Sequence, residues 1–411
     1  MEKLRRVLGL TIRIGLFTAI LTGGTLLALT MGETPGLALA DLSDAPVQAL
    51  ADVPQSGILY AALNGGTHPA GVYRSEDHGH TWQVVNSAPQ AAVTTLTVDP
   101  GNSQTLYAGS AGGPLATNNV WRSLDGGQTW QNFNLPLPAS PARLVPAVTA
   151  TAVDPNHPDI LYVGTDGQGV YRYDVGRIGY ELVGGLALVD SHVKELVASS
   201  DSQLYVLTNG GLYVTTGQDI WRRLDTVPEV PISLVVAPTN PQILYVGGPS
   251  GGAFRSLDGG ATWESISAGL GLTPGVALRV TALAVDEQDA AHVLVATGYG
   301  LGSQVAPGGL FESHDGGRRW TQIAELDSVV NELTFDQRIV HAATSAGLER
   351  YGEPNEPAAT RSKSTLSLRT LTKPTGIQLL VLALTVGLAG LVLVGRLEWL
   401  LRRRRAAASL R

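Results

Sequence analysis

Short apolar runs separated by Gly, Pro, Asp and Asn recur along most of this 411-residue chain. One unit covers residues 93–109 and reads VTTLTVDPGNSQTLYAG. Three more units are clear and three are weaker; they begin at Val148, Ile232 and Val280, and near Val47, Val193 and Val330. Runs of this length, rich in Val, Thr and Tyr and bounded by turn residues, are typical of β-strands. The pattern therefore predicts a repeated β structure.

The spacing of the units indicates the kind of repeat. Equivalent positions lie 38 to 55 residues apart, at Leu50, Leu96, Thr151, Leu196, Leu234, Leu283 and Leu333. A period of about 40 to 50 residues with four short strands is that of a β-propeller blade. Seven units predict an all-β, seven-bladed β-propeller over residues 41–351. The last unit ends near Tyr351 after three strands, so ring closure needs a strand from elsewhere, and residues 41–46 and 365–371 are both candidates.

A second motif closes the third strand in four of the units. In the first unit it reads SEDHGHTW. Its defining residues are Ser75, Asp77, Gly79 and Trp82, then Ser123, Asp125, Gly127 and Trp130, then Ser256, Asp258, Gly260 and Trp263, and finally Ser313, Asp315, Gly317 and Trp320. In a tight hairpin, Asp accepts backbone N–H groups, Gly supplies a positive φ, and Trp fills space against the blade. We therefore expect these residues to build turns and not to act as catalytic carboxylates.

The motif resembles the Asp-box, or BNR, repeat, S-x-D-x-G-x-T-W. Degraded copies stand at residues 173–176 and 215–221 in the third and fourth units. Asp-box propellers include sialidases, xyloglucan-type glycoside hydrolases, sortilin-like receptor domains and photosystem II assembly factors. The resemblance covers about residues 47–351. It implies a propeller with Asp-box hairpins but does not imply a single function.

Few residues match the glycoside hydrolase patterns. The sialidase pattern contains Arg-Ile-Pro, whereas residues 177–179 read RIG. The xyloglucanase pattern has a catalytic Asp within Arg-Thr-Asp-Ile/Val-Gly-Gly. The nearest stretch, RYDVGR at residues 172–177, lacks the Thr and the second Gly. Asp174 is therefore expected to belong to a degraded Asp-box turn.

Long loops on one face of the expected disc form the predicted binding surface. All Asp-boxes join strands three and four and lie at one face, so the longer connections between strands two and three and between blades emerge at the other. Such loops on a rigid scaffold commonly carry binding residues, although each is also compatible with a solvated position. The candidates are Asn64, His68, Asn118, Asn119, Arg143, Tyr299 and Gln304.

Neither a metal nor a cofactor is expected from the sequence. The eight His are scattered, there is no Cys, and no phosphate-binding loop precedes a helix. Residues 41–351 carry 14 of the 28 Lys and Arg but 30 of the 35 Asp and Glu, a net charge of −16. Because nucleic acids require clustered basic residues, this acidic body excludes a nucleic-acid partner.

Both ends of the chain have the character of membrane segments. Residues 1–40 combine a basic start, a long apolar run and Ala-Leu-Ala, as in a signal peptide or an uncleaved signal anchor. After a linker at 352–375, residues 376–395 carry no charge and are long enough for a transmembrane helix. The basic tail at 396–411 predicts a cytoplasmic C-terminus and an extracytoplasmic propeller at the plasma membrane, in a single- or double-pass protein. A sorting signal is the alternative, although LTKPTG at 371–376 departs from Leu-Pro-x-Thr-Gly.

These features together predict a membrane-anchored propeller that binds a protein or saccharide partner without catalysis, for example as an assembly scaffold. A cell-surface glycoside hydrolase is the first alternative and a sortilin-like peptide receptor is the second. Two carboxyl groups facing one cleft on the long-loop face, about 5 to 9.5 Å apart, would favour the hydrolase.

Overall fold

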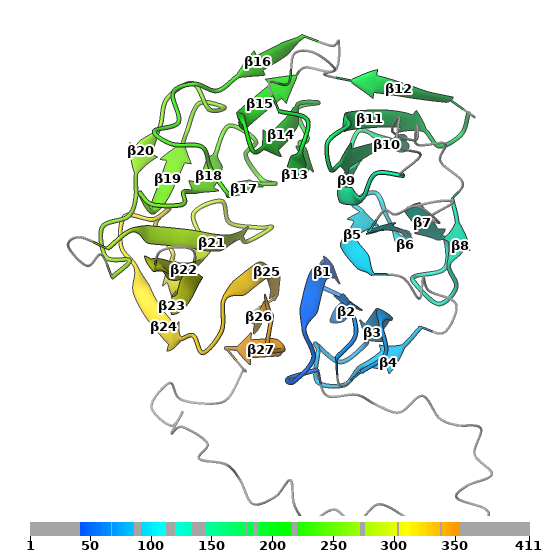
Figure 1. Ribbon diagram of the computed structural model, residues 1–411, viewed down its shortest axis with the longest axis horizontal. Helices are drawn as coiled ribbons and strands as arrows, with labels where there is room; N and C mark the ends of the chain where they lie inside the picture. Colours follow the sequence, from blue (N-terminus) through cyan, green and yellow to red (C-terminus); the bar gives the residue numbers. More distant parts are fainter. Residues whose placement is uncertain are drawn as a thin grey trace, which may run out of the picture. The chain divides into compact units, whose positions relative to one another are not determined.

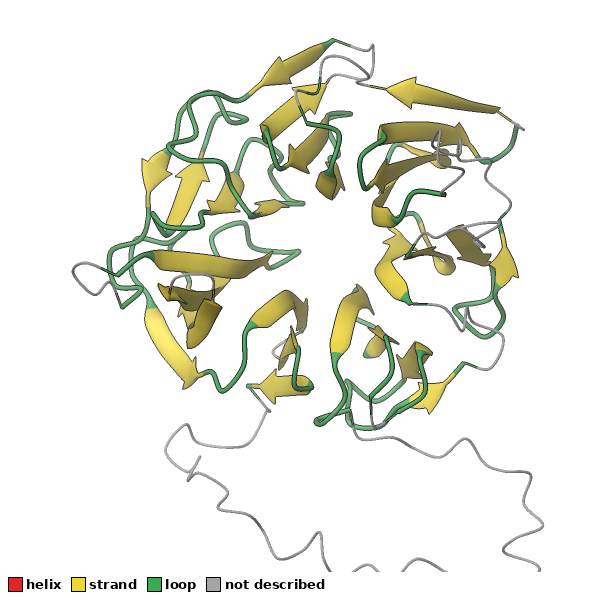
Figure 2. Ribbon diagram, in the orientation of Figure 1, coloured by secondary structure: helices red, strands yellow, loops and turns green. Residues whose placement is uncertain are grey.

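The computed structural model describes residues 42–66, 68–85, 92–111, 120–133, 145–177, 179–183, 188, 190–215, 220–271, 276–301, 304–337 and 339–352. Within these ranges every regular element is a β-strand (Figure 2), and no helix is long and apolar enough to cross a membrane. The predicted signal segment, transmembrane span and basic tail lie outside the described residues. So does the linker, apart from its first residue.

Seven antiparallel sheets surround a common axis, which confirms the predicted seven-bladed β-propeller (Figure 1). Blade 1 contains β1 (Val47–Val53), β2 (Ile58–Leu63), β3 (Gly71–Ser75) and β4 (Gln83–Val84). Blade 2 contains β5 (Val93–Asp99), β6 (Asn102–Ser110), β7 (Val120–Ser123) and β8 (Gln131–Asn132). Blade 3 contains β9 (Val148–Asp154), β10 (His157–Thr165), β11 (Gly169–Asp174) and β12 (Gly179–Val183). Blade 4 contains β13 (Val193–Ala198), β14 (Leu204–Thr208), β15 (Gly211–Thr215) and β16 (Trp221–Arg223).

The remaining three blades follow the same order along the chain. Blade 5 contains β17 (Ser233–Val236), β18 (Leu244–Gly247), β19 (Ala253–Ser256) and β20 (Glu264–Ser265). Blade 6 contains β21 (Leu278–Val285), β22 (Val293–Leu301), β23 (Gln304–Ser313) and β24 (Thr321–Glu325). Blade 7 contains β25 (Val330–Asp336), β26 (Ile339–Thr344) and β27 (Leu348–Tyr351). The first strand of each blade is the innermost, and all seven positions that defined the sequence period lie in these inner strands (Figure 1).

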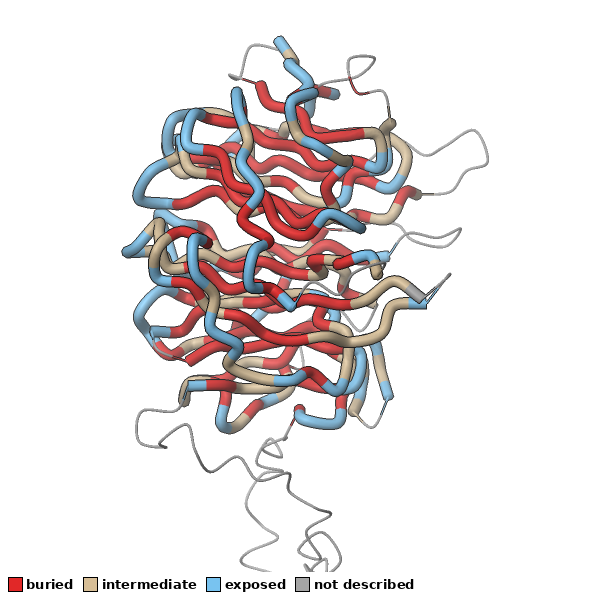
Figure 3. The backbone as a smooth tube through the Cα atoms, turned by 90° about the vertical axis from the view of Figure 1, so that its left-hand side faces the viewer, coloured by how far each residue is buried: buried red, intermediate tan, exposed pale blue. Residues whose placement is uncertain are grey.

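Apolar side chains cover both faces of each blade, so neighbouring blades must pack against each other. One core cluster combines Tyr60 and Val72 of blade 1 with Val93 and Leu106 of blade 2. The other clusters likewise combine residues of adjacent blades, and the buried residues run through the interior of the disc (Figure 3). A blade at the end of an open stack would expose one apolar face to water. Closure into a ring buries both faces of every blade.

The four Asp-boxes have the hydrogen bonds expected of tight turns. In blade 2, Asp125 Oδ1 accepts the Thr129 N–H at 2.8 Å and its Oδ2 accepts the Thr129 hydroxyl at 2.5 Å. Ser123 Oγ donates to Asp125 at 2.8 Å and accepts the Gly127 N–H at 2.9 Å. Although burial opposes ionisation, these bonds lower the pKa of Asp125. The box carboxylates are thus committed to turn structure, as predicted.

The Gly two residues after the Asp of each box packs against the preceding blade. Gly127 has a φ of 77°, and a Cβ there would lie 2.4 Å from the Tyr60 ring of blade 1. Tyr60 also donates its hydroxyl to the carbonyl of Gly126 at 2.7 Å. The same kind of approach joins Gly260 to Leu224, Gly317 to Ile266, and Gly79 to His341. Each box therefore contributes to the contact between two blades.

Ring closure joins the three-stranded blade 7 to blade 1 mainly through side chains. Glu332 accepts the Leu50 N–H at 2.6 Å, and Thr334 donates to Asp52 at 2.5 Å. His78 in the first Asp-box contacts Asp336 at 2.7 Å. Of the two candidate closing segments, residues 42–46 form no strand but supply one backbone bond to β27, from Leu348 N–H to Leu42 carbonyl at 2.8 Å. Residues 365–371 lie outside the described ranges.

The Asp-box network makes a stability prediction. Replacing Ser123 by Ala leaves the buried Gly127 N–H without its acceptor, so we expect a loss of about 1–3 kcal/mol in the free energy of unfolding. Leu124→Ala, in the same turn at a 61% exposed position, is the control and should change stability little. Denaturant unfolding of the full chain measures both variants. Equal effects of the two substitutions would contradict the structural role of the serine.

Candidate functional site

A cavity of about 470 Å³ lies between blades 1, 6 and 7. Its lining residues are Asp52, Gln55, Asp286, Glu287, Gln288, Phe335 and Gln337. All of them stand at the ends of inner strands or in the turns that follow, where each inner strand turns into the second strand of its blade. These turns are at the Asp-box face, because box residues bond to them: the Gly316 N–H donates to the Ala291 carbonyl at 2.8 Å, and the His78 N–H to the Gly57 carbonyl at 3.0 Å.

The cavity is acidic. Its lining contains three carboxyl groups, on Asp52, Asp286 and Glu287, and neither Lys nor Arg. Burial raises the pKa of Asp52 to about 6, although the hydrogen bond from Thr334 by itself lowers it. Burial and the nearby Asp52 raise the pKa of Glu287 to about 7. Water still reaches these side chains, which are half-buried. The site therefore holds acids that ionise near neutral pH and become more acidic when a cation approaches.

Two further carboxyl groups belong to inner strands. Glu195 on β13 accepts the Leu234 N–H of blade 5 at 2.9 Å, just as Glu332 on β25 accepts that of Leu50. Burial among the inner strands raises the pKa of Glu195 to about 8 and that of Glu332 to about 7. The charge of Glu332 adds to the rise at Glu195, and the charge of Asp52 adds to the rise at Glu332. Their bonds link neighbouring blades, so their first role is structural.

Basic side chains stand at the opposite ends of the inner strands. Lys194 follows the first residue of β13, and Arg279 follows the first residue of β21. Burial and the charge of Arg279 lower the pKa of Lys194. The inner strands all run in the same direction, so Lys194 and Arg279 lie toward the long-loop face, away from the acidic cavity.

The predicted binding residues lie on the long-loop side but do not form one cluster in the described structure. Asn64 and His68 follow β2 in blade 1, and His68 contacts Asp44 at 3.3 Å. Tyr299 and Gln304 belong to the long β22–β23 hairpin of blade 6, where the Tyr299 hydroxyl donates to the Gly271 carbonyl at 3.3 Å. Asn118, Asn119 and Arg143 lie outside the described residues. The prediction of a binding surface on this face therefore stays a prediction.

Asp174 has the role expected of a degraded Asp-box. Its Oδ1 accepts the N–H groups of Gly176 and Arg177 at 3.1 and 3.2 Å, in the turn after β11. Two arginines that directly precede the Ser of a box contact aromatic side chains: Arg74 lies 3.4 Å from the Tyr60 hydroxyl, and Arg122 covers the Phe133 ring at 4.4 Å. Neither set of residues converges on the acidic cavity.

The cavity residues could not be identified from the sequence, because Asp52 and Glu287 look like ordinary residues of strand ends and turns. Asp ends the inner strand in three of the seven units, and only the ring closure brings the turns of blades 1, 6 and 7 together. The available signal was an excess of acidic side chains in the sixth unit, where DEQD follows β21. It is too common in turns to identify a site.

Comparisons with known proteins confirm the expected resemblances. The family model described as sortilin, neurotensin receptor 3, matches residues 70–173. A xyloglucanase from Paenibacillus is 27% identical over 298 residues, which cover 65% of this chain and 25% of the relative. A xyloglucanase from Acetivibrio thermocellus is 26% identical over 247 residues, 47% of this chain and 28% of the relative. The chain thus spans about a quarter of the length of the curated relatives it matches.

Solved structures of two kinds share the fold. A family GH74 xyloglucanase from Xanthomonas campestris aligns with a TM-score of 0.59 and 20% identity, over 76% of this chain and 52% of that chain. YCF48 from Cyanidioschyzon merolae aligns with a TM-score of 0.53 and 15% identity, over 76% of this chain and 96% of that chain. The structure of YCF48 bound to D1 peptide aligns with a TM-score of 0.55 and 16% identity, over 76% of this chain and 95% of that chain. At these identities the likeness concerns the fold alone.

The raised pKa values of Glu195 and Glu332 predict how stability depends on pH. Both folded-state values, about 8 and about 7, lie above the ordinary 4.5, so the folded chain binds more protons than the unfolded chain between about pH 5 and 8. Their contribution to stability is therefore full at low pH and falls as pH rises through this window. Replacing either residue by Gln keeps the acceptor oxygen and removes the charge.

We expect Glu195→Gln and Glu332→Gln to melt at temperatures similar to that of the wild-type chain at pH 5. At pH 8.5 they should be more stable, by about 1–2 kcal/mol each after allowance for solvent screening. Glu325→Gln, at an exposed position of β24, is the control and should show no such pH-dependent gain. Thermal unfolding across this pH range measures the difference. Gln variants that are less stable at pH 8.5 would contradict the assignment.

Proposed function

We propose that this propeller is a non-catalytic binding scaffold, and that its acidic cavity receives a basic group of a protein partner. The observation that carries the proposal is the cavity itself, in which Asp52, Asp286 and Glu287 come from two blades and the lining contains neither Lys nor Arg. His292, outside the lining, contacts Asp286 at 3.0 Å, so the proposal rests on Asp52 and Glu287. Arg or Lys side chains of a partner would supply the missing charge and stabilise the ionised acids. A rigid ring holds these groups in place before binding, so less conformational entropy is lost when a partner binds.

A peptide ligand is consistent with the relatives. The family model that matches residues 70–173 is that of sortilin, a receptor, and one solved structure of the same fold is YCF48 bound to D1 peptide. The chain in that structure is matched over 95% of its length, so it is similar in size to this propeller. A sortilin-like peptide receptor and an assembly scaffold are therefore two forms of the same proposal.

The scaffold is proposed to be anchored at the plasma membrane with its propeller on the extracytoplasmic side. The support is the sequence of the two ends: a signal peptide or signal anchor at 1–40, an uncharged span at 376–395 and a basic tail at 396–411. The propeller's net charge of −16 over residues 41–351 disfavours contact with anionic lipid, so the cavity would remain available to a partner.

A cell-surface glycoside hydrolase is the second candidate. It is favoured by the xyloglucanases among the sequence relatives, although this chain spans about a quarter of their length. Glu287 also favours the hydrolase, because its pKa of about 7 would suit a general acid. Against it, Asp174, at the position nearest to the xyloglucanase pattern, is occupied in a turn. We regard binding as the better supported function.

The binding proposal predicts a charge-selective interaction with a labelled hexa-arginine peptide. Asp52→Asn combined with Glu287→Gln removes two cavity charges and should weaken binding about tenfold or more. Because the two acids ionise with pKa values of about 6 and 7, wild-type affinity should rise from pH 6 to pH 8. Fluorescence anisotropy with the full chain measures both effects.

The matched control for this double variant removes two exposed carboxylates outside the cavity, by Glu325→Gln with Asp327→Asn. It should bind the peptide as the wild type does. Binding that is unaffected by the cavity variant, or equal binding of a hexa-glutamate peptide, would refute the proposed site.

The hydrolase alternative makes a separate prediction. Under the binding proposal, the full chain incubated with xyloglucan releases no reducing sugar above that of a blank, and Glu287→Gln behaves in the same way. Release by the wild type that disappears in Glu287→Gln would establish catalysis at this cavity and replace the scaffold proposal.

A further inference from the structure

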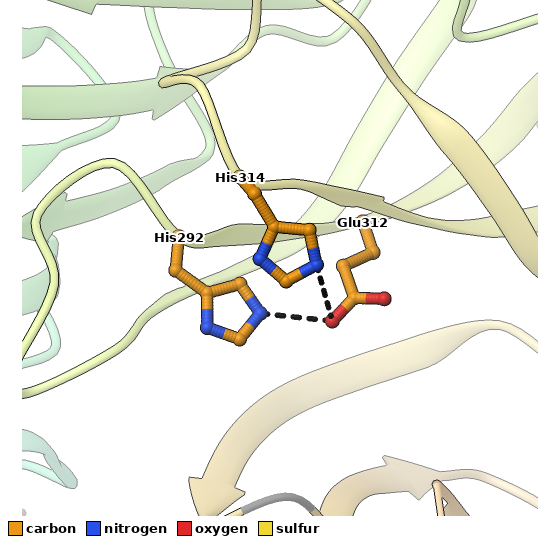
Figure 4. Close-up of side chains that lie close together, drawn as sticks. All are labelled: His292, Glu312 and His314. Atoms are coloured by element: carbon orange, nitrogen blue, oxygen red, sulfur yellow. Dashed lines mark hydrogen bonds and ion pairs between the residues drawn. The ribbon is translucent and has the colours of Figure 1, made fainter.

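Two histidines from different turns, His292 and His314, lie side by side in blade 6. His292 lies directly before β22, Glu312 is the second-last residue of β23, and His314 directly follows β23 in the Asp-box (Figure 4). The antiparallel register pairs Leu294 with Glu312 and Val293 with Ser313, so the backbone places all three side chains at one end of the hairpin. One nitrogen of each ring and a carboxylate oxygen lie within 4.8 Å of one another.

Blade 6 departs from the repeat at this position. In blades 1, 2, 3 and 5 the second strand carries a Tyr opposite an Arg of the third strand: Tyr60 and Arg74, Tyr107 and Arg122, Tyr162 and Arg172, and Tyr245 and Arg255. In blade 6 the pair is Leu294 and Glu312. The repeated cation is thus replaced by a carboxylate, and two imidazoles stand beside it. A half-buried carboxylate in this place needs a cationic partner.

The distances are close to those of a metal site. His292 Nε2 lies 2.8 Å from Glu312 Oε1, and His314 Nε2 lies 3.6 Å from the same oxygen. Ligands bound tetrahedrally at about 2.0–2.1 Å from zinc are about 3.3 Å apart, so shifts of about half an ångström would admit the ion. His314 is largely exposed and free to make such a shift, with 69% of its side-chain surface accessible.

The surroundings already orient the central ligand. Asp286 Oδ2 lies 3.0 Å from Nδ1 of His292, which leaves Nε2 directed at Glu312. This carboxylate–histidine arrangement is the one that fixes the tautomer and raises the basicity of metal-bound imidazoles. The His292 ring is also held between His314, at 4.3 Å, and Phe335 of blade 7, at 4.7 Å between ring centroids.

We propose that His292, Glu312 and His314 form a binding site for one transition-metal dication of the zinc class, with Asp286 as the residue that orients His292. Two imidazoles and one carboxylate leave a fourth position open to water or to a ligand side chain. The ion would connect the inner-strand turn of blade 6 to its Asp-box, beside the residues Asp286 and Phe335 that also line the acidic cavity. The site does not depend on the proposed binding function.

The test is metal titration of the full chain, prepared without a histidine tag and stripped with a chelator. We expect one Zn²⁺ per chain by calorimetry, and visible absorption bands of a tetrahedral complex on addition of Co²⁺. His314→Ala and Glu312→Gln should abolish this binding. Asp286→Asn should weaken it about 10- to 100-fold. Circular dichroism of the metal-free variants verifies that they are folded, and His314→Ala changes a mostly exposed side chain.

His157→Ala is the matched control, because His157 lies 3.4 Å from Asp154 in the corresponding turn of blade 3, where the third strand offers Arg172 in place of a glutamate. It should bind zinc like the wild type. Absence of stoichiometric binding, or wild-type binding by His314→Ala, would overturn the proposal and leave the cluster as an ion pair of protonated His292 with its two carboxylates. Since His314 does not line the cavity, peptide binding by His314→Ala tests the scaffold proposal separately.

Discussion

The contact between blade 7 and blade 1 is the constraint on which the rest of this structure depends. Every blade buries both of its faces, so the ring is stable only if the last blade meets the first. Among the described residues this junction has no shared sheet, and side chains make most of its contacts: Glu332 accepts the Leu50 N–H, Thr334 donates to Asp52, and His78 contacts Asp336. Such bonds bring ionisable groups into partly buried positions, where desolvation shifts their pKa values.

The acidic cavity is a consequence of that junction. Asp52 belongs to the closure network and also lines the cavity, and Phe335 extends from the last blade into the same space. Asp52, which helps to close the ring, thus lies beside Glu287, which lines the cavity and is accessible to a ligand. The raised pKa values of Glu195, Glu332 and Asp52 lower the stability of the folded chain at neutral pH. A cationic partner in the cavity would offset this loss at Asp52, which lines it.

Repetition explains both what the blades share and what distinguishes one of them. The Asp-boxes keep the same turn bonds in four blades, and in each a glycine approaches a side chain of the preceding blade. Against this background, Glu312 and His314 stand out because they occupy positions that carry other residues in the equivalent blades. Replacement of the Arg that is common to four blades changes the charge at one hairpin end and creates the His292 cluster.

The sequence by itself determined the fold class, the number of blades, the inner strands and the Asp-box turns, because all of these rest on local patterns that repeat along the chain. The turn role of Asp125 and Asp174 followed from the same local chemistry. Only the tertiary structure decided that Asp52 and Glu287 share a cavity and that His292 meets His314. Asp52 and Glu287 are 235 positions apart and adjacent only after the ring closes, and the two histidines are 22 apart and adjacent only in the register of β22 with β23. Proximity of this kind is a property of closure and strand pairing, which no single segment encodes.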